Sequence, residues 1–371
     1  MKSLNFINKF HPQLVEAFKS QDPDLFDIVF EIEGKNLYAD KLILSINSST
    51  FKSMLSDRWI SKNHSIKIET YKFDDFKKLL TFIYSGECNL TDENIFTILD
   101  MSEFYQIEDL KELCDEYLSK MELNLSNIIQ LSEISNKYSL IQMKEPIQNF
   151  IFPNFKIIVK SDEFLNTEKS VVTEIIAVGQ TFAIKYDEMF QAAFEWSENQ
   201  VIKKQDGLSD ENFNMNDAIK VEMQEFLPYI KFDQIEYTFF TEYVFERGFI
   251  FTSDEFRDIL ESVKSNVKVK ITNKNGQSIY GLLPKENDAI SIIKSLQDQW
   301  SVASVYWETY CKKPSNPSPL KKRIGAICYL FYFSDGDIGI FTDATDDRCL
   351  LAEIYSETDF EFISDFKIEI V

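Results

Sequence analysis

The sequence has few of the residues on which catalytic and metal sites are usually built. Two histidines, His11 and His64, occur in 371 residues, and the ten glycines form no phosphate-binding loop. The five cysteines form no Cys-x-x-Cys pair and lie away from both histidines in the sequence. We therefore expect no enzyme activity, no metal site and no cofactor, and we expect five free thiols in a reducing compartment.

Long apolar runs are also missing. No stretch approaches the roughly 20 residues that a bilayer crossing needs, and residues 1–9 lack the apolar run of a signal peptide. Acidic side chains outnumber basic ones by 61 to 39, and the resulting net charge of -22 repels phosphate backbones and anionic lipid. We expect a cytoplasmic protein, with the nucleus as the alternative, that binds neither nucleic acid nor membrane.

The clearest pattern begins at residue 26. Residues 26–32 alternate apolar and acidic side chains, which predicts a half-buried strand, and Gly34 marks a turn into a second extended segment. A helix with Phe76, Leu80, Ile83 and Tyr84 on one face is predicted to end at Gly86. Two further helices are predicted, one carrying Ile95, Ile98 and Leu99 inward and one burying Ile107, Leu110, Cys114, Tyr117 and Leu118.

Together these segments resemble the BTB (POZ) domain. The resemblance rests on residues 26–30, 41–44, 48–55, 82–86 and 110–118, in that order. It implies a protein-interaction module, often dimeric, with helices beside a short sheet and no chemistry of its own.

Two parts of the BTB-like segment bear on dimer formation. Asp27 and Lys41 match the charged pair that BTB dimers keep near their interface, so the resemblance implies a homodimer. Residues 1–26, with an amphipathic helix predicted at 12–18, correspond to the segment that often crosses to a partner subunit. A frayed terminal helix is the alternative for that segment.

A third part bears on cullin binding. Cullin-binding BTB domains carry, in the loop after the helix that matches residues 51–55, a hydrophobic residue, any residue and then an acidic one. This sequence has Trp59, Ile60 and Ser61 there. The hydrophobic residue is kept and the acid is replaced, so the resemblance implies cullin docking through this loop with one contact missing.

Helical periodicity dominates from residue 123 to about residue 260. Residues 131–140, 190–196 and 226–232 resemble the BACK domain, which follows BTB in many ubiquitin-ligase adaptors. The aromatic residues in these segments recur at helical spacing, which is typical of core positions rather than of a cofactor site.

Strand-like alternation begins again beyond residue 263. Val267, Val269 and Ile271 alternate with polar residues, and Asn275-Gly276 predicts a hairpin turn. Further strands are predicted at residues 303–310, 324–333, 338–341, 350–355 and 366–371. Because residues 327–333 are apolar without interruption, that strand should be covered on both faces. A small antiparallel sandwich or barrel is expected.

The predicted fold class is multidomain α+β. A BTB/POZ α/β domain is placed at residues 1–120, an all-α BACK-like domain at 121–262 and a small, mostly antiparallel β domain at 263–371.

Two charged clusters in the last segment have alternative interpretations. Asp335 and Asp337, with Asp343, Asp346 and Asp347 nearby, could hold calcium, but they lack the spacing of an EF-hand loop and are favoured as turn residues. Lys312, Lys313, Lys321, Lys322 and Arg323 surround three prolines. A solvated loop is favoured there over a nuclear signal or a site for an acidic partner.

The leading functional hypothesis is a dimeric substrate adaptor of a cullin-RING ubiquitin ligase, whose β domain recruits an unknown protein target. A dimeric BTB scaffold outside ubiquitin chemistry is the second hypothesis, motivated by Ser61. Enzymatic or metal-binding activity of the acidic cluster in the β domain is the third and least favoured.

Overall fold

The computed structural model describes residues 2–56, 65–205, 213–285, 287–296, 298–302, 306–309, 322–333, 336–342, 349–355, 360–362 and 365–371, with side chains from residue 10 onward. The chain divides into two compact units. One comprises Met1–Asn124 and Ile134–Ile147, and the other comprises Leu125–Glu133 and Gln148–Val371.

The first unit contains a three-stranded sheet with the order β2-β1-β3. β1 (Ile28–Ile32) pairs antiparallel with β2 (Lys35–Ala39) and parallel with β3 (Ile66–Lys67). Glu33 and Gly34, which join β1 to β2, have positive φ angles of 49° and 73°, the geometry that a tight two-residue hairpin needs. The predicted strand and turn are confirmed.

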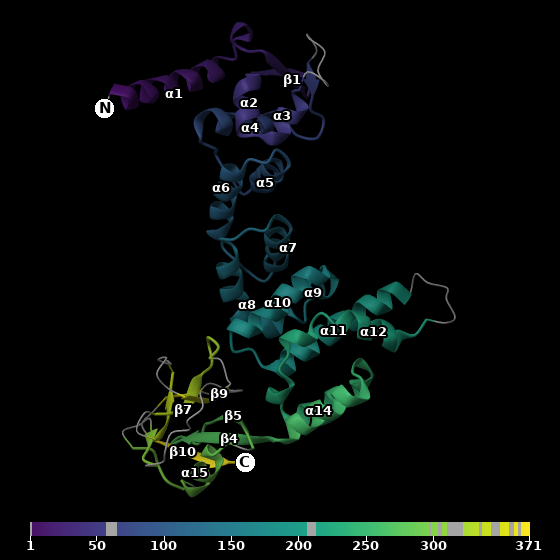
Figure 1. The fold of residues 1–371 in the computed structure, drawn as a ribbon, viewed down its shortest axis with the longest axis vertical. Helices are drawn as coiled ribbons and strands as arrows, with labels where there is room; N and C mark the ends of the chain where they lie inside the picture. Colours follow the sequence, from purple (N-terminus) through teal and green to yellow (C-terminus); the bar gives the residue numbers. More distant parts are fainter. Residues whose placement is uncertain are drawn as a thin grey trace. The chain divides into compact units, whose positions relative to one another are not determined.

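Helices complete the first unit (Figure 1). They are η1 (Pro23–Leu25), α1 (Lys2–Ser20), α2 (Lys41–Asn47), α3 (Ser49–Met54), α4 (Phe73–Ser85), α5 (Ile95–Phe104) and α6 (Glu108–Ser119). As predicted, α4 ends at Gly86, whose φ of 75° is the left-handed conformation that glycine adopts without a steric penalty. The core is aromatic: the buried rings of Phe51 and Tyr105 stack with their centres 4.3 Å apart, and Phe30 and Phe76 pack beside them.

α1 is longer than the predicted helix at residues 12–18. Proline is most common in the first turn of a helix, which placed the predicted start at Pro12, but α1 begins at Lys2 and contains Pro12 in its interior. Among residues 10–20 only Phe18 is buried, and its ring stacks on that of Tyr84 at 4.3 Å. The rest of α1 extends away from the body of this unit (Figure 1).

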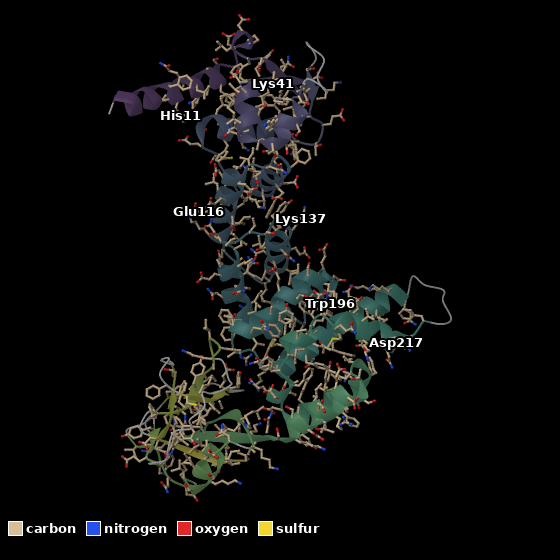
Figure 2. The ribbon with its side chains drawn as sticks, viewed as in Figure 1. His11, Lys41, Glu116, Lys137, Trp196 and Asp217 are labelled. Carbon is tan, nitrogen blue, oxygen red and sulfur yellow. The ribbon has the colours of Figure 1, made fainter. Side chains whose placement is uncertain are left out.

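α7 (Ile128–Tyr138) and α8 (Lys144–Ile158) each have residues in both units. The helical part of the second unit continues with α9 (Asp162–Asn166), α10 (Lys169–Thr181), α11 (Tyr186–Gln205), α12 (Met215–Met223), η2 (Leu227–Tyr229), η3 (Phe232–Gln234), α13 (Tyr237–Phe239), η4 (Phe240–Val244), η5 (Phe245–Ile250) and α14 (Ser253–Lys264). The buried Trp196 of α11, labelled in Figure 2, donates from Nε1 to the carbonyl oxygen of Thr167 at 3.2 Å. The aromatic residues of α11 are therefore core residues, as predicted.

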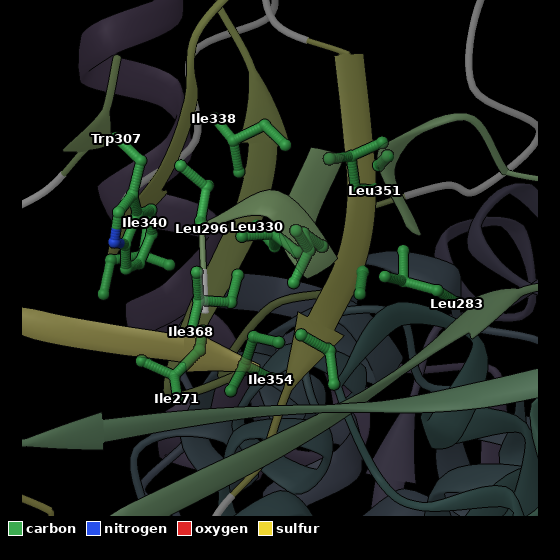
Figure 3. Close-up of a cluster of buried hydrophobic side chains, with 14 of the residues drawn as sticks. Ile271, Leu283, Leu296, Trp307, Leu330, Ile338, Ile340, Leu351, Ile354 and Ile368 are labelled. Atoms are coloured by element: carbon green, nitrogen blue, oxygen red, sulfur yellow. The ribbon is translucent and has the colours of Figure 1, made fainter. Parts of the chain in front are cut away.

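The C-terminal region of the second unit is a sandwich of two antiparallel sheets. One sheet has the order β10-β4-β5 and the other β6-β8-β7-β9. The strands are β4 (Asn266–Asn273), β5 (Ser278–Pro284), β6 (Tyr306–Trp307), β7 (Cys328–Tyr332), β8 (Ile338–Phe341), β9 (Cys349–Ile354) and β10 (Phe366–Ile370), and a short helix, α15 (Ala289–Ser295), lies between β5 and β6 in the sequence. Ile271, Leu330, Ile354 and Ile368 are among the buried side chains that meet between the sheets (Figure 3).

Every residue of β7 is buried, as predicted for this apolar run. Cys328, Leu330 and Tyr332 face the core between the two sheets. Tyr329 and Phe331 face the other way and form a second cluster with Leu350 and with Ala183 of the helical region. Part of the outer face of this sheet therefore packs against the helical region.

Several sequence expectations concern residues that the structure describes only in part. Cys88, Cys114, Cys328 and Cys349 are free thiols, while Cys311 lies outside the described residues. No helix in the described ranges combines the length and the apolar character that crossing a membrane requires. The domain limits at residues 120 and 262 remain predictions.

Candidate interaction sites

Asp27 and Lys41, the residues predicted to lie near a dimer interface, meet in the structure. The backbone N–H of Lys41, the first residue of α2, donates to Oδ1 of Asp27 at 2.7 Å. Figure 2 labels Lys41 at this helix end. Asp40, the N-cap residue, makes no side-chain capping bond of its own. Asp27 therefore caps α2 from outside the helix, with its negative charge near the positive end of the helix dipole.

Asp40 and Tyr84 connect this cap to the core. The N–H of Asp40 donates to the Tyr84 hydroxyl oxygen at 2.7 Å. Burial, together with the nearby charge of Asp27, raises the pKa of the Asp40 carboxyl. Because Phe18 stacks on the same Tyr84 ring, the last turns of α1 and the start of α2 are held at one corner of the domain.

Apolar side chains are exposed beside this corner. Leu42 and Ile46 of α2 are 68% and 72% exposed, and Leu25 of η1 is 54% exposed. Leu42 and Ile46 are four residues apart and so lie on one face of α2. Exposed apolar residues grouped on one face mark candidate protein interfaces.

The predicted cullin-docking residues Trp59, Ile60 and Ser61 lie outside the described residues. The helix before them, α3, is held in place at its N-terminal end. Ser48 caps α3 by accepting the N–H of Phe51 at 3.0 Å, and Thr50 donates to the carbonyl oxygen of Phe104 at 3.0 Å. Phe104 itself is 58% exposed next to this contact.

The interpretation of Arg323 as part of a solvated basic loop is wrong. Its side chain is 3% exposed and pairs with Glu353 of β9, whose side chain is 6% exposed, at 2.7 Å. The prolines and lysines that precede residue 323 predict an exposed loop, whereas the partners of Arg323 lie far away in the sequence. Residues 310–321 of the same cluster lie outside the described residues.

All five N–H donors of Arg323 are used. Nε and Nη2 donate to Oε2 of Glu353 at 3.0 and 2.7 Å, and Nη2 also donates to the hydroxyl of Tyr355. Nη1 donates to the carbonyl oxygens of Gly179 and Ile184 at 2.7 and 2.8 Å. A guanidinium has five donors in a planar fork, so this site satisfies it completely.

A short stretch of backbone pairing supports this junction between the helical region and the sandwich. Phe182 and Ile324 form a parallel bridge, in which Ala183 donates to the carbonyl oxygen of Ile324 and Ile324 donates to that of Thr181, both at 2.7 Å. Gly325, with φ of 88°, lies against the ring of Phe152 so closely that a Cβ atom would overlap it. A side chain at position 325 is thus excluded by both conformation and space.

A pocket of about 60 Å³, partly open to solvent, lies at the same junction. Its lining residues come from the start of α11, from the segment 231–236, from β4 and β5, and from β9 and the residue after it; they are Lys185, Tyr186, Asp187, Lys231, Asp233, Gln234, Glu236, Asn266, Tyr280, Gly281, Leu282, Pro284, Glu353 and Tyr355. Burial raises the pKa of Asp187 to about 7, and the charge of Glu236 adds to the effect. No sequence motif pointed to this pocket, because its walls are separated by up to about 170 residues of chain.

The acidic cluster of the third hypothesis is mostly beyond the described residues. Of its members, Asp337 is described: it is buried and its Oδ1 accepts the N–H of Thr309, 28 residues away in the sequence, at 2.8 Å. Asp335, Asp343, Asp346 and Asp347 fall outside the described ranges. Within those ranges, no group of three or more acidic, cysteine or histidine side chains is placed to hold a metal ion.

Comparison with known proteins agrees with the two resemblances. The family model of the BTB/POZ domain matches residues 15–122, and that of the BACK domain (BTB And C-terminal Kelch) matches residues 128–210. The chain is a BTB–BACK protein. Gly179 and Ile184, which bind Arg323, belong to the BACK domain so defined, and Arg323 follows it in the sequence.

Curated relatives match 40% to 50% of the length of this BTB–BACK protein. Kelch-like protein 7 of Rattus norvegicus is 24% identical over 173 residues, which are 46% of this chain and 29% of the relative. Kelch-like protein 24 of Homo sapiens is 25% identical over 50% of this chain and 30% of its own. BTB and MATH domain-containing protein 42 of Caenorhabditis elegans is 27% identical over 40% of this chain and 37% of its own. The similarity thus spans about a third of each relative's length.

Proposed function

We propose that this BTB–BACK protein is a dimeric substrate adaptor of a cullin-RING ubiquitin ligase in the cytoplasm or nucleus. The observation that carries the proposal is the order of domains, a BTB domain at residues 15–122 followed directly by a BACK domain at 128–210. The resemblance stated above gives that order to ubiquitin-ligase adaptors. In this proposal the sandwich recruits the protein target and no chemistry is carried by the chain itself.

Cullin docking is assigned to Trp59, Ile60 and Ser61. Trp59 supplies the hydrophobic anchor, while Ser61 stands where cullin-binding BTB domains have an acid. The loss of one anchor contact commonly costs more than about 1 kcal/mol, or nearly tenfold in affinity, so the complex is weakened and retained.

A calorimetric titration of the full chain with the N-terminal domain of the BTB-binding cullin tests this assignment. We expect submicromolar binding by wild type, a loss of more than about tenfold in Trp59→Ala and tighter binding by Ser61→Glu. Trp300→Ala is the matched control, since Trp300 is a partly exposed tryptophan of the sandwich. Equal binding by Trp59→Ala and Trp300→Ala would refute the docking assignment.

Dimer formation is assigned to the corner formed by α1 and α2. The exposed Leu42 and Ile46 flank the Asp27–Lys41 contact, and most described residues of α1 contribute little to the core of their own domain. An isolated helix is marginally stable in water, so a second subunit that covers α1 would stabilise it.

Light scattering on wild type and Ile46→Glu tests the dimer. Ile141→Glu is the control, because Ile141 is 77% exposed in the same unit and outside the proposed interface. We expect wild type and the control to be dimers and Ile46→Glu to be a monomer. A monomeric wild type, or an Ile46→Glu dimer of wild-type strength, would rule out this interface.

A dimeric scaffold without a ligase role is the second candidate, and the observation that favours it is Ser61. It predicts that wild type binds no cullin and that Ser61→Glu restores binding. In that case the BTB dimer would serve to bring two sandwiches together for avidity.

A further inference from the structure

The pocket between the BACK domain and the sandwich is lined by more acidic than basic side chains. Carboxyl groups come from both sides of it: Asp187 from the BACK domain and Glu353 from β9, with Asp233 and Glu236 between. Two basic residues, Lys185 and Lys231, also line the pocket; Lys231 is exposed, so solvent screens its charge, and Lys185 is half-buried. Tyr186, Tyr280 and Tyr355 supply aromatic walls.

The protein's own cations already use these walls. The guanidinium carbon of Arg323 lies 4.3 Å from the centre of the Tyr186 ring, and Nζ of Lys268 lies 4.5 Å from that of Tyr280. Arg323 pairs with Glu353, and Lys268 pairs with Glu236 at 3.3 Å. Each of these cations therefore combines a carboxylate with an aromatic face, the arrangement that stabilises guanidinium and ammonium groups.

Asp187 is the carboxyl at the centre of this arrangement. Its Oδ1 accepts the N–H of Glu236 at 3.2 Å, which links the carboxyl to the segment opposite. The charged groups that act on Asp187 are Lys185 and Glu188 from its own segment and Glu236 from the segment opposite, and Lys231, Asp233 and Glu353 line the same pocket.

We propose that this pocket binds one lysine or arginine side chain of a target peptide, with Asp187 as the carboxylate that pairs with it. The pocket volume of about 60 Å³ suits a single charged head group and is far below the roughly 300–1,000 Å³ of cofactor pockets. The inference rests on the proposed function, because it names the chemistry of the target that the C-terminal half recruits.

A proton competes with such a ligand. Since the pKa of Asp187 is about 7, roughly a tenth of the carboxyl is ionised at pH 6 and most of it at pH 8. A cationic side chain pairs with the ionised form. Affinity should therefore rise about tenfold between pH 6 and pH 8.

The test is a calorimetric titration of the full chain with acetyl-Ala-Arg-Ala-amide, and with the same peptide in which citrulline replaces arginine. We expect the arginine peptide to bind at least tenfold tighter than the neutral citrulline peptide, with the stated rise from pH 6 to pH 8. Asp187→Asn should weaken the arginine peptide by about tenfold or more and abolish the pH dependence. Asp298→Asn, the same substitution at an exposed position outside the pocket lining, should change neither.

Several results would overturn the proposal. Equal binding of the two peptides would exclude a charge-specific site, and unchanged binding by Asp187→Asn would remove the assigned carboxylate. Binding of agmatine, a small guanidinium compound, without binding of the arginine peptide would exclude a target peptide as the ligand. A cooperative melt of Asp187→Asn at or above the wild-type temperature verifies that this variant is folded.

The titration contains no cullin, so its failure is separate from failure of the adaptor function. If the chain binds cullin through Trp59 but binds neither peptide, the proposed function stands and this inference is rejected. If the chain binds the arginine peptide but no cullin, the assignment of the pocket stands, and the scaffold becomes the favoured function in place of the ligase adaptor.

Discussion

Arg323 and Glu353 form an ion pair inside the protein, with two donors of the guanidinium directed at a single carboxylate oxygen at 3.0 and 2.7 Å. The two side chains are 3% and 6% exposed. Since the remaining donors of Arg323 bind carbonyl oxygens of the BACK domain and the hydroxyl of Tyr355, this one side chain fastens the sandwich to the helices.

Removal of Arg323 should strongly destabilise the chain. Arg323→Met leaves the Glu353 carboxylate buried without its partner, which typically lowers the free energy of unfolding by about 3–5 kcal/mol. Urea unfolding measures the change. Arg257→Met is the control, because Arg257 forms an exposed pair with Asp254, and such pairs contribute at most about 1 kcal/mol. Equal effects of the two variants would contradict the role given to Arg323.

The double variant Arg323→Met/Glu353→Leu separates pairing from packing. With both charges gone, no buried charge is left uncompensated, so the double variant should be more stable than Arg323→Met alone. A double variant that is less stable than the single one would show that the two side chains contribute independently.

Gly325 should tolerate alanine far less than Gly276 does. Both have positive φ, 88° and 80°, so alanine is strained by about 1–2 kcal/mol at either site. A Cβ at Gly276 meets nothing within 4 Å, whereas one at Gly325 overlaps Phe152. Thermal unfolding should therefore show a larger loss for Gly325→Ala, and equal losses would mean that this contact has no energetic weight.

Asp187 should make stability depend on pH. Its pKa is about 7 in the folded chain and 3.8 in the reference state, so the folded chain holds a proton between pH 4 and 7 that the unfolded chain has lost. The stability that the folded chain has while the Asp187 carboxyl is protonated is fully present below pH 4 and is lost as the pH rises through 7.

Asp187→Asn removes this titration. At pH 8 we expect the variant to be more stable than wild type by on the order of 2 kcal/mol, a value reduced by the access of solvent to the pocket. At pH 4 the two should melt alike. Melting temperatures at both pH values measure this, and a stability difference that is the same at pH 4 and pH 8 would disprove it.

Asp115 should be important for the segment that immediately precedes α8. Its buried carboxylate accepts the N–H groups of Ile141, Gln142 and Met143 at 2.8, 2.8 and 3.1 Å. Asp115→Ala leaves these amides without their acceptor and should lower the free energy of unfolding by about 3 kcal/mol. Asp115→Asn keeps one acceptor oxygen and should lose less. An Asn variant as unstable as the Ala variant would argue against hydrogen bonding as the cause.

The sequence predicted the elements whose signals are local. Three of these signals each span only a few residues: the alternation in β1, the glycine that ends α4 and the Asn-Gly turn between β4 and β5. Residue type and spacing were therefore enough to predict these elements. The apolar run of β7 likewise predicted burial on both faces. A short helix such as α15 has too few turns for its periodicity to stand out.

The junction between the BACK domain and the sandwich was not predictable in this way. Arg323 binds Gly179 and Ile184 across 144 and 139 residues of chain, and a basic residue after a lysine-rich stretch is usually exposed. The Asp27–Lys41 proximity agrees with the BTB resemblance, while its role at a dimer interface stays a prediction.

The covering of β7 has a practical consequence for the search for targets. A fragment that begins at residue 263 would leave behind Ala183 and the carbonyl oxygens of Gly179 and Ile184, and it would present Tyr329, Phe331 and Leu350 to water. We expect such a fragment, when used as a bait, to bind many proteins non-specifically through this exposed apolar surface. A bait that retains the BACK helices keeps this surface closed, and the proteins it captures report on the native molecule.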